Sequence, residues 1–142
     1  MSRNWIEFGE GPKKASPDEI GVSLNLRGEI VFNRHTYNEM NRPEAVVLLF
    51  DPDTDSIGLR PASPHALNAF RPKIKGHAQH RVVRAMAFTR KHNIKVDGTV
   101  RFPTATIEDG ILVLNLRYMV TVTGTPRKGK RQRQANVRKR WY

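Results

Sequence analysis

Acidic side chains alternate in the segment FDPDTDSIGLRP, at Asp51, Asp53 and Asp55. Carboxylates at alternate positions are typical of a calcium-binding loop, which also requires glycine at its sixth position and glutamate at its twelfth. Counted from Asp51, these two positions hold Ser56 and Ala62. The flanking runs VVLLF and IGL are typical of strands and not of the helices that enclose such a loop. We therefore predict a β-hairpin turn here and no calcium site.

Few other residues have the types and spacing that catalysis needs. The chain has no cysteine, which excludes thiolate catalysis and cysteine-based metal sites. His77 and His80 have a spacing that suits metal ligation on a helix, but no cysteine or acid nearby completes a site. The serines lack the context of a nucleophile elbow. We therefore predict no catalytic residues, no metal site and no cofactor. A metal-dependent nuclease that uses the three aspartates or Glu108-Asp109 is kept as an alternative.

Basic side chains are the most informative feature of the sequence. The net charge is +12, yet residues 1–55 carry a net charge of −4. Residues 56–96 hold 9 Lys and Arg and no acid, and residues 110–142 again hold 9 with no acid. Such a polarised charge favours a polyanion, because each neutralised phosphate releases a counterion. From the first acid-free segment we predict five nucleic-acid contacts, namely Arg71, Lys73, Lys75, Arg81 and Arg84.

The end of the chain, PRKGKRQRQANVRKRWY, carries 8 Lys and Arg in residues 126–142. Cations combined with a terminal aromatic pair suit phosphate contact and base stacking. The alternative is a solvated tail that aids solubility. The predicted contacts in this tail are Arg127, Lys128, Lys130, Arg131, Arg133, Arg138, Lys139, Arg140 and Trp141. Charge alone does not separate DNA from RNA, or nucleic acid from an acidic protein.

The elements that must position these side chains follow from periodicity. Residues 1–20 are expected to form an N-terminal arm, with Trp5, Ile6 and Phe8 pinning its start to the body. Residues 21–122 are expected to form one α+β, mostly β core. Its first part reads as ββαββ: strands over 22–26 and 29–32, a helix over 34–41, and hairpin strands over 46–50 and 57–59. Asn33 is the expected helix N-cap, and Pro43 ends the helix.

A second ββαββ-like unit is predicted further along the chain. Residues 62–79 read as a connector. A strand over 80–84, a helix over 85–93, and hairpin strands over 99–107 and 111–116 follow it. Phe88 falls 51 residues after Tyr37, and Ile111 falls 54 after Ile57. We interpret residues 80–116 as an internal repeat of residues 21–61. Strand character continues to residue 122, and residues 123–142 are expected to be a basic disordered tail.

Residues 26–61 resemble the AbrB/MazE-type swapped-hairpin motif. Arg27-Gly28 match its basic-Gly pair, Ile30 and Phe32 its alternating apolar residues, Arg34 its lysine and Pro43 its proline. Glutamate, asparagine and Glu-Ala stand at positions 29, 33 and 44–45, where the family has glutamine, proline and Gly-Asp.

The resemblance implies a DNA-binding regulator in which paired motifs form a small β-barrel. It implies that Arg27 and Arg34 lie at the DNA surface. The two halves of this chain would supply both motifs, giving either a monomer with internal pseudo-symmetry or a homodimer.

We therefore expect a non-enzymatic protein that binds DNA or RNA, with transcription regulation as the role that the resemblance implies. The first alternative is an interaction or assembly protein whose basic tail docks an acidic partner. The second is the nuclease. No apolar run reaches the length of a membrane span, and the N-terminus lacks the apolar stretch of a signal peptide, so no membrane association and a cytoplasmic location are expected.

Overall fold

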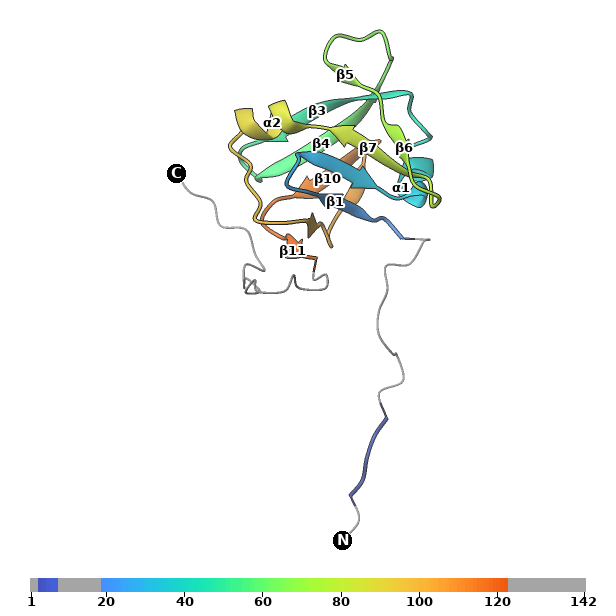
Figure 1. Ribbon diagram of the computed structural model, residues 1–142, viewed down its shortest axis with the longest axis vertical. Helices are drawn as coiled ribbons and strands as arrows, with labels where there is room; N and C mark the ends of the chain where they lie inside the picture. The colour runs from blue at the N-terminus through green and yellow to red at the C-terminus, as the bar shows by residue number, and fades with distance from the viewer. Residues whose placement is uncertain (1–2, 8–18, 123–142) are drawn as a thin grey trace.

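The computed structural model describes residues 3–7 and 19–122 of the chain. These residues form a mostly β domain with two antiparallel sheets and two short helices (Figure 1). The predictions for residues 8–18 and for the tail over 123–142 lie outside the described residues. Within the described part, neither helix has the length and apolar character that crossing a membrane requires.

The first sheet has six strands in the order β11-β8-β1-β2-β7-β6. Their bounds are β1 (Val22–Leu24), β2 (Glu29–Phe32), β6 (Lys73–Lys75), β7 (His80–Arg84), β8 (Val100–Arg101) and β11 (Val120–Thr121). The second sheet has five strands in the order β5-β3-β4-β10-β9. These are β3 (Ala45–Asp51), β4 (Ser56–Ala62), β5 (Ala69–Phe70), β9 (Thr106–Glu108) and β10 (Ile111–Asn115).

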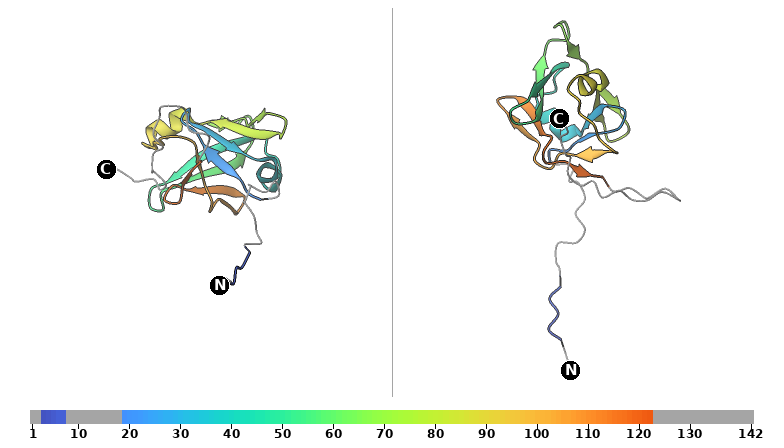
Figure 2. Two further views of the ribbon diagram at one scale, coloured as in Figure 1. Left: turned by 60° about the horizontal axis from the view of Figure 1, so that its bottom comes forward. Right: turned by 90° about the vertical axis from the view of Figure 1, so that its left-hand side faces the viewer.

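The hydrophobic core lies between the two sheets, whose strands surround a common interior (Figure 2). Ile30 and Phe32 of the first sheet and Ile57, Leu59 and Leu112 of the second are fully buried. Alternate residues of a strand point to opposite faces of its sheet. One face of each sheet therefore fills the core, and the other face of the first sheet is left to carry polar and charged side chains.

The acidic segment forms the predicted hairpin. β3 and β4 pair antiparallel over their whole length, from Ala45 opposite Ala62 to Asp51 opposite Ser56. The Asp51 carboxylate accepts hydrogen bonds from the Asp53 N–H and the Thr54 hydroxyl, each at 2.9 Å. These bonds, that of Thr54 first, hold the pKa of Asp51 below its ordinary value. The carboxylate thus closes the turn.

Both helices form near their predicted positions, α1 over Arg34–Glu39 and α2 over Met86–Lys91. The Asn33 side chain caps α1 by accepting the Thr36 N–H, as predicted. The bond from the Tyr37 N–H to the Asn33 carbonyl recurs 52 residues later, from Thr89 to Ala85.

The helix ends repeat with the same spacing. The bond from Arg42 to Tyr37 recurs from Ile94 to Thr89, again 52 residues on. Asn41 and Asn93 end the helices with positive φ angles of 64° and 54°. Two copies of one structural unit would produce this 52-residue spacing of hydrogen bonds. The internal repeat remains our interpretation of the spacing.

Three sequence-based predictions were wrong. The strand expected over 99–107 is broken: β8 belongs to the first sheet and β9 to the second, because Pro103 lies in a turn between them. The connector over 62–79 contains β5 and β6, which are edge strands of the two sheets. Trp5 and Ile6 are 82% and 89% exposed, so these two side chains do not pin the arm to the body.

Candidate nucleic-acid interface

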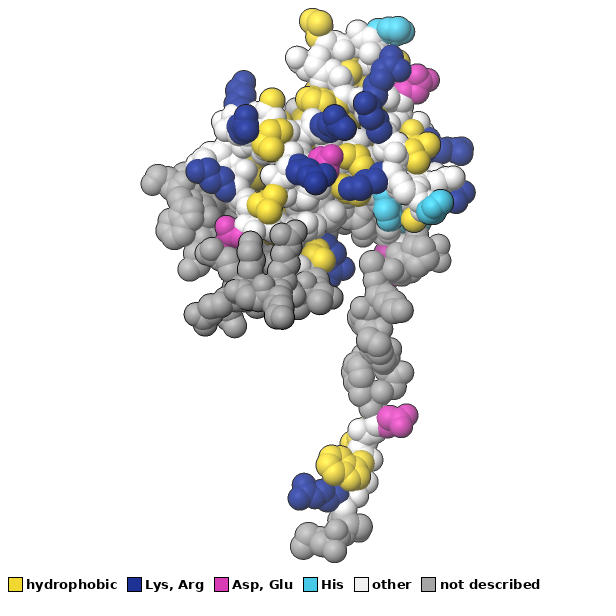
Figure 3. Space-filling view, viewed as in Figure 1, with side chains coloured by type: hydrophobic (Ala, Val, Ile, Leu, Met, Phe, Trp, Pro, Cys, Tyr) yellow, Lys and Arg dark blue, Asp and Glu magenta, His cyan; other side chains and the backbone are white. Residues whose placement is uncertain are grey.

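Five predicted contact residues come together in one groove of about 610 Å³ on the domain surface. They are Arg27 from the β1–β2 turn, Arg71 from the segment between β5 and β6, Lys73 and Lys75 from β6, and Arg84 from β7. The lining also contains four apolar residues: Ala69, Phe70, Ile74 and Val82. Figure 3 shows this face, where Lys and Arg side chains surround a single acidic side chain with hydrophobic atoms between them.

Strand pairing brings these cations to the same face of the first sheet. Residues directly opposite each other in paired antiparallel strands point to the same side. Lys73 lies opposite Val82 on β7, and Arg84 lies opposite Glu29 on β2. The neighbours Ile30 and Val83 point the other way into the core. The burial of one face therefore fixes the cations on the other, and a shift of one residue in register would reverse both.

The turn that carries Arg27 is held by the Asn25 side chain. Its Oδ1 atom accepts the N–H of Arg27 at 2.9 Å and the N–H of Glu29 at 3.0 Å. Its Nδ2 atom donates to the Glu29 carboxylate at 2.9 Å. Asparagine suits this role because its short amide can bond the backbone two residues further on. Arg27 is thus an exposed side chain on an ordered turn.

Gly28 anchors the same turn to the start of α2. Its φ is +73°, a conformation that favours glycine. A Cβ atom here would lie 2.7 Å from the Met86 Cα. The Gly28 carbonyl accepts the Ala85 N–H at 2.7 Å. Only a residue without a side chain permits this approach.

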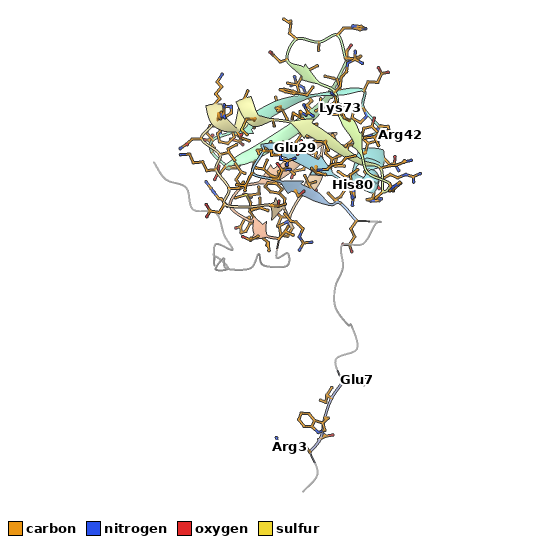
Figure 4. All side chains as sticks on the ribbon, viewed as in Figure 1. Arg3, Glu7, Glu29, Arg42, Lys73 and His80 are labelled. Atoms are coloured by element: carbon orange, nitrogen blue, oxygen red, sulfur yellow. The ribbon has the colours of Figure 1, made fainter. Side chains whose placement is uncertain are left out.

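Glu29 is the only acidic side chain among the described residues that line the groove. The Asn25 hydrogen bond is the largest effect on its pKa and holds it below the ordinary value. Burial, the next largest effect, opposes this, and the charges of Lys75, Arg27 and Arg84 each lower the pKa further. Glu29 forms no ion pair within 4.0 Å with these cations. Figure 4 labels Glu29, on β2, and Lys73, on the edge strand β6 of the same sheet. The groove therefore keeps a net charge of +4 at neutral pH.

Two other predicted contacts lie elsewhere. The Arg81 guanidinium lies over the Tyr37 ring, 4.2 Å from its centroid, and donates to the Gln79 carbonyl at 3.4 Å. This geometry is a cation–π contact that joins β7 to α1. Arg34 is exposed at the first residue of α1 and is absent from the groove lining. The nine predicted tail residues lie outside the described part of the chain.

Sequence reasoning missed the apolar part of this groove. Phe70, Ile74 and Val82 were not singled out, although Lys73-Ile74-Lys75 has the polar–apolar alternation of a strand. Glu29 was noted only as a departure from the family motif. In residues 3–7 and 19–122, no three His, Asp or Glu side chains gather closely enough to hold a metal ion.

No protein-family model, curated protein or solved structure matches this chain. The resemblance to the AbrB/MazE-type motif therefore stays a prediction from residues 26–61.

Proposed function

We propose that this protein binds nucleic acid and that the groove on the first sheet receives the phosphate backbone. The observation that carries the proposal is the convergence of five cations, from segments up to 57 residues apart, around one surface groove with a single acid. Scattered surface lysines would serve solubility alone. Cations gathered around one groove instead attract a polyanion to that place, because each phosphate that they neutralise releases a counterion.

The composition of the groove favours backbone contact over the reading of bases. Lysine is a compact point charge, and arginine can bond a phosphate with two N–H groups. Contacts of these kinds position a protein on nucleic acid without reading its sequence. We propose that the cations of residues 126–142 add to the same attraction. Transcription regulation, which the family resemblance implies, would require sequence recognition in addition.

A second candidate function is docking of an acidic protein segment. The apolar groove residues Phe70, Ile74 and Val82 favour it, because Ile74 is 64% exposed and would be buried by apolar side chains of a partner. We place nucleic acid first because residues 126–142 add 8 Lys and Arg and a terminal Trp-Tyr pair, a combination that suits phosphate contact and base stacking.

The test is fluorescence anisotropy with labelled duplex and single-stranded oligonucleotides across a salt series. The double variant Lys73→Gln/Lys75→Gln removes two groove charges. The matched control Arg60→Gln/Lys91→Gln removes two exposed charges outside the groove. We expect the slope of log K against log salt to become shallower by about 1–2 in the groove variant on duplex DNA, and by much less in the control.

Equal losses in both variants would show that net charge acts without the groove. If the protein binds acidic peptides but neither kind of oligonucleotide, the second candidate function is correct.

A further inference from the structure

The loop over residues 63–68, between β4 and β5, projects from one end of the domain (Figure 1). It carries Leu67, whose side chain is 89% exposed. Among the described large hydrophobic side chains, Ile6 alone is as exposed. The loop sequence, SPHALN, contains no charged residue, whereas Arg60 and Arg71 flank it.

Local hydrogen bonds give this loop a defined shape. The Ser63 hydroxyl accepts the His65 N–H at 3.2 Å, and the Ser63 carbonyl accepts the Ala66 N–H at 3.0 Å. Asn68 has a φ of +67°, which turns the chain back toward β5. Asparagine tolerates this left-handed conformation better than most residues. The exposure of Leu67 is therefore a property of an ordered turn.

The loop is continuous with the candidate interface. It leads directly into Ala69, Phe70 and Arg71, which all line the basic groove. A nucleic acid lying in the groove would therefore meet the base of the loop. No acid occurs anywhere in residues 56–96, so nothing in this segment repels phosphates from the loop.

We propose that Leu67 is an apolar wedge that enters the minor groove of a duplex, partly unstacks one base step and bends the duplex. This inference rests on the proposed nucleic-acid binding. Proteins that bend DNA in this way insert a leucine, isoleucine, phenylalanine, methionine or proline side chain between base pairs, while cations nearby hold the backbone. The loop and the groove supply these two parts. Pyrimidine–purine steps should be preferred, because they unstack most easily.

The experiment measures bending and unstacking separately from binding. A duplex with a donor and an acceptor dye at its ends reports bending by energy transfer. A second duplex with 2-aminopurine at a central TA step reports unstacking by increased fluorescence. The full chain should raise both signals. With Leu67→Ala, most of the increase in energy transfer and in 2-aminopurine fluorescence should be lost. The slope of log K against log salt should not change, and the affinity should fall by less than about tenfold.

Val120→Ala is the control, because Val120 is also an exposed aliphatic residue, at 39%, and lies on β11, at the opposite edge of the first sheet from β6. It should keep both signals. Thermal unfolding of each variant verifies folding, which truncation of a solvent-exposed aliphatic side chain should not disturb.

The outcomes separate this inference from the proposed function. Steep salt-dependent binding without bending or unstacking would refute the wedge and leave nucleic-acid binding in place. Bending that Leu67→Ala does not reduce would also refute it. Absence of binding to any oligonucleotide would overturn both proposals. Binding of an apolar protein pocket that depends on Leu67, without any duplex bending, would show that the loop serves a protein partner.

Discussion

Replacement of Gly28 by alanine tests whether the Arg27 turn depends on close contact with α2. The added Cβ would lie 2.7 Å from the Met86 Cα, 3.0 Å from the Met86 nitrogen and 3.1 Å from its Cβ. Two of these atoms are backbone, so no side-chain rotation relieves the contact. Either the turn or the start of α2 must move, which weakens the bond between the Ala85 N–H and the Gly28 carbonyl.

Two effects contribute to the loss of stability in Gly28→Ala, and substitutions at other glycines separate them. A left-handed conformation costs a non-glycine residue about 1–2 kcal/mol. Forcing an extra methyl group into a packed site adds about 1–3 kcal/mol. We therefore expect Gly28→Ala to lower the free energy of unfolding by about 2–5 kcal/mol, whereas Gly110→Ala should lose only the first part. Gly110 has a φ of +80°, but nothing lies within 4 Å of its added Cβ. Gly98→Ala, which has neither problem, should cost less than about 0.5 kcal/mol.

Urea unfolding followed by circular dichroism measures all three variants, and the oligonucleotide assay then measures those that stay folded. Gly28→Ala should also weaken binding, because the turn presents Arg27 to the groove. Gly110→Ala should bind like the unmodified chain. If Gly28→Ala and Gly110→Ala lose equal stability, the contact with Met86 does not constrain the turn, and our account of how Arg27 is held is wrong.

Three further predictions concern single side chains. Glu29→Gln should tighten oligonucleotide binding about two- to fivefold at low salt, because it removes the negative charge of the groove lining. The glutamine keeps an oxygen that accepts the Asn25 hydrogen bond. Glu44→Gln, outside the groove, should change binding little. Arg81→Gln should lower the free energy of unfolding by about 0.5–1 kcal/mol, because the contact with the Tyr37 ring is lost. The slope of log K against log salt should not change, and a shallower slope would show that Arg81 contacts phosphate. The His92 ring stacks on the Phe50 ring and lies tilted against the Phe88 ring, and burial, followed by the Lys91 charge, lowers its pKa. The folded state therefore disfavours the protonated ring, and stability present above pH 6.5 should fall as the pH drops below that value. His92→Phe should flatten this part of the profile of stability against pH.

The elements that the sequence predicts well are those specified by neighbouring residues. Asn33 caps α1 through a residue three positions away, and the β3–β4 hairpin closes through Asp51 and Thr54. The β6 strand is different, because its three residues are ordered by pairing with β7 across a turn. Such a short run carries too little periodicity to be recognised alone. The break at Pro103 was missed for a related reason, since only the tertiary structure sends β8 and β9 to different sheets.

The candidate site was predictable as a set of charges but not as a surface. An acid-free stretch identifies Arg71, Lys73, Lys75 and Arg84 as cations near one another in sequence. Arg27 reaches the same groove only because β2 pairs with β7 in a register that places Glu29 opposite Arg84. The same register sends Arg81, three residues from Arg84, opposite Phe32 and toward Tyr37.

The start of α2 contacts the turn that carries Arg27, and the start of α1 makes the corresponding backbone contact elsewhere. The two helix ends share their backbone bonds, yet Asn33 caps α1 with its side chain while Ala85 has no capping side chain. The N–H of each of these residues donates to a glycine carbonyl, from Asn33 to Gly21 at 3.0 Å and from Ala85 to Gly28 at 2.7 Å. Gly21 lies just before β1, whereas Gly28 lies in the β1–β2 turn. Of these two bonds, the one from Ala85 therefore ties a helix to the turn that carries Arg27, and it holds this turn beside Arg84, the residue that precedes Ala85.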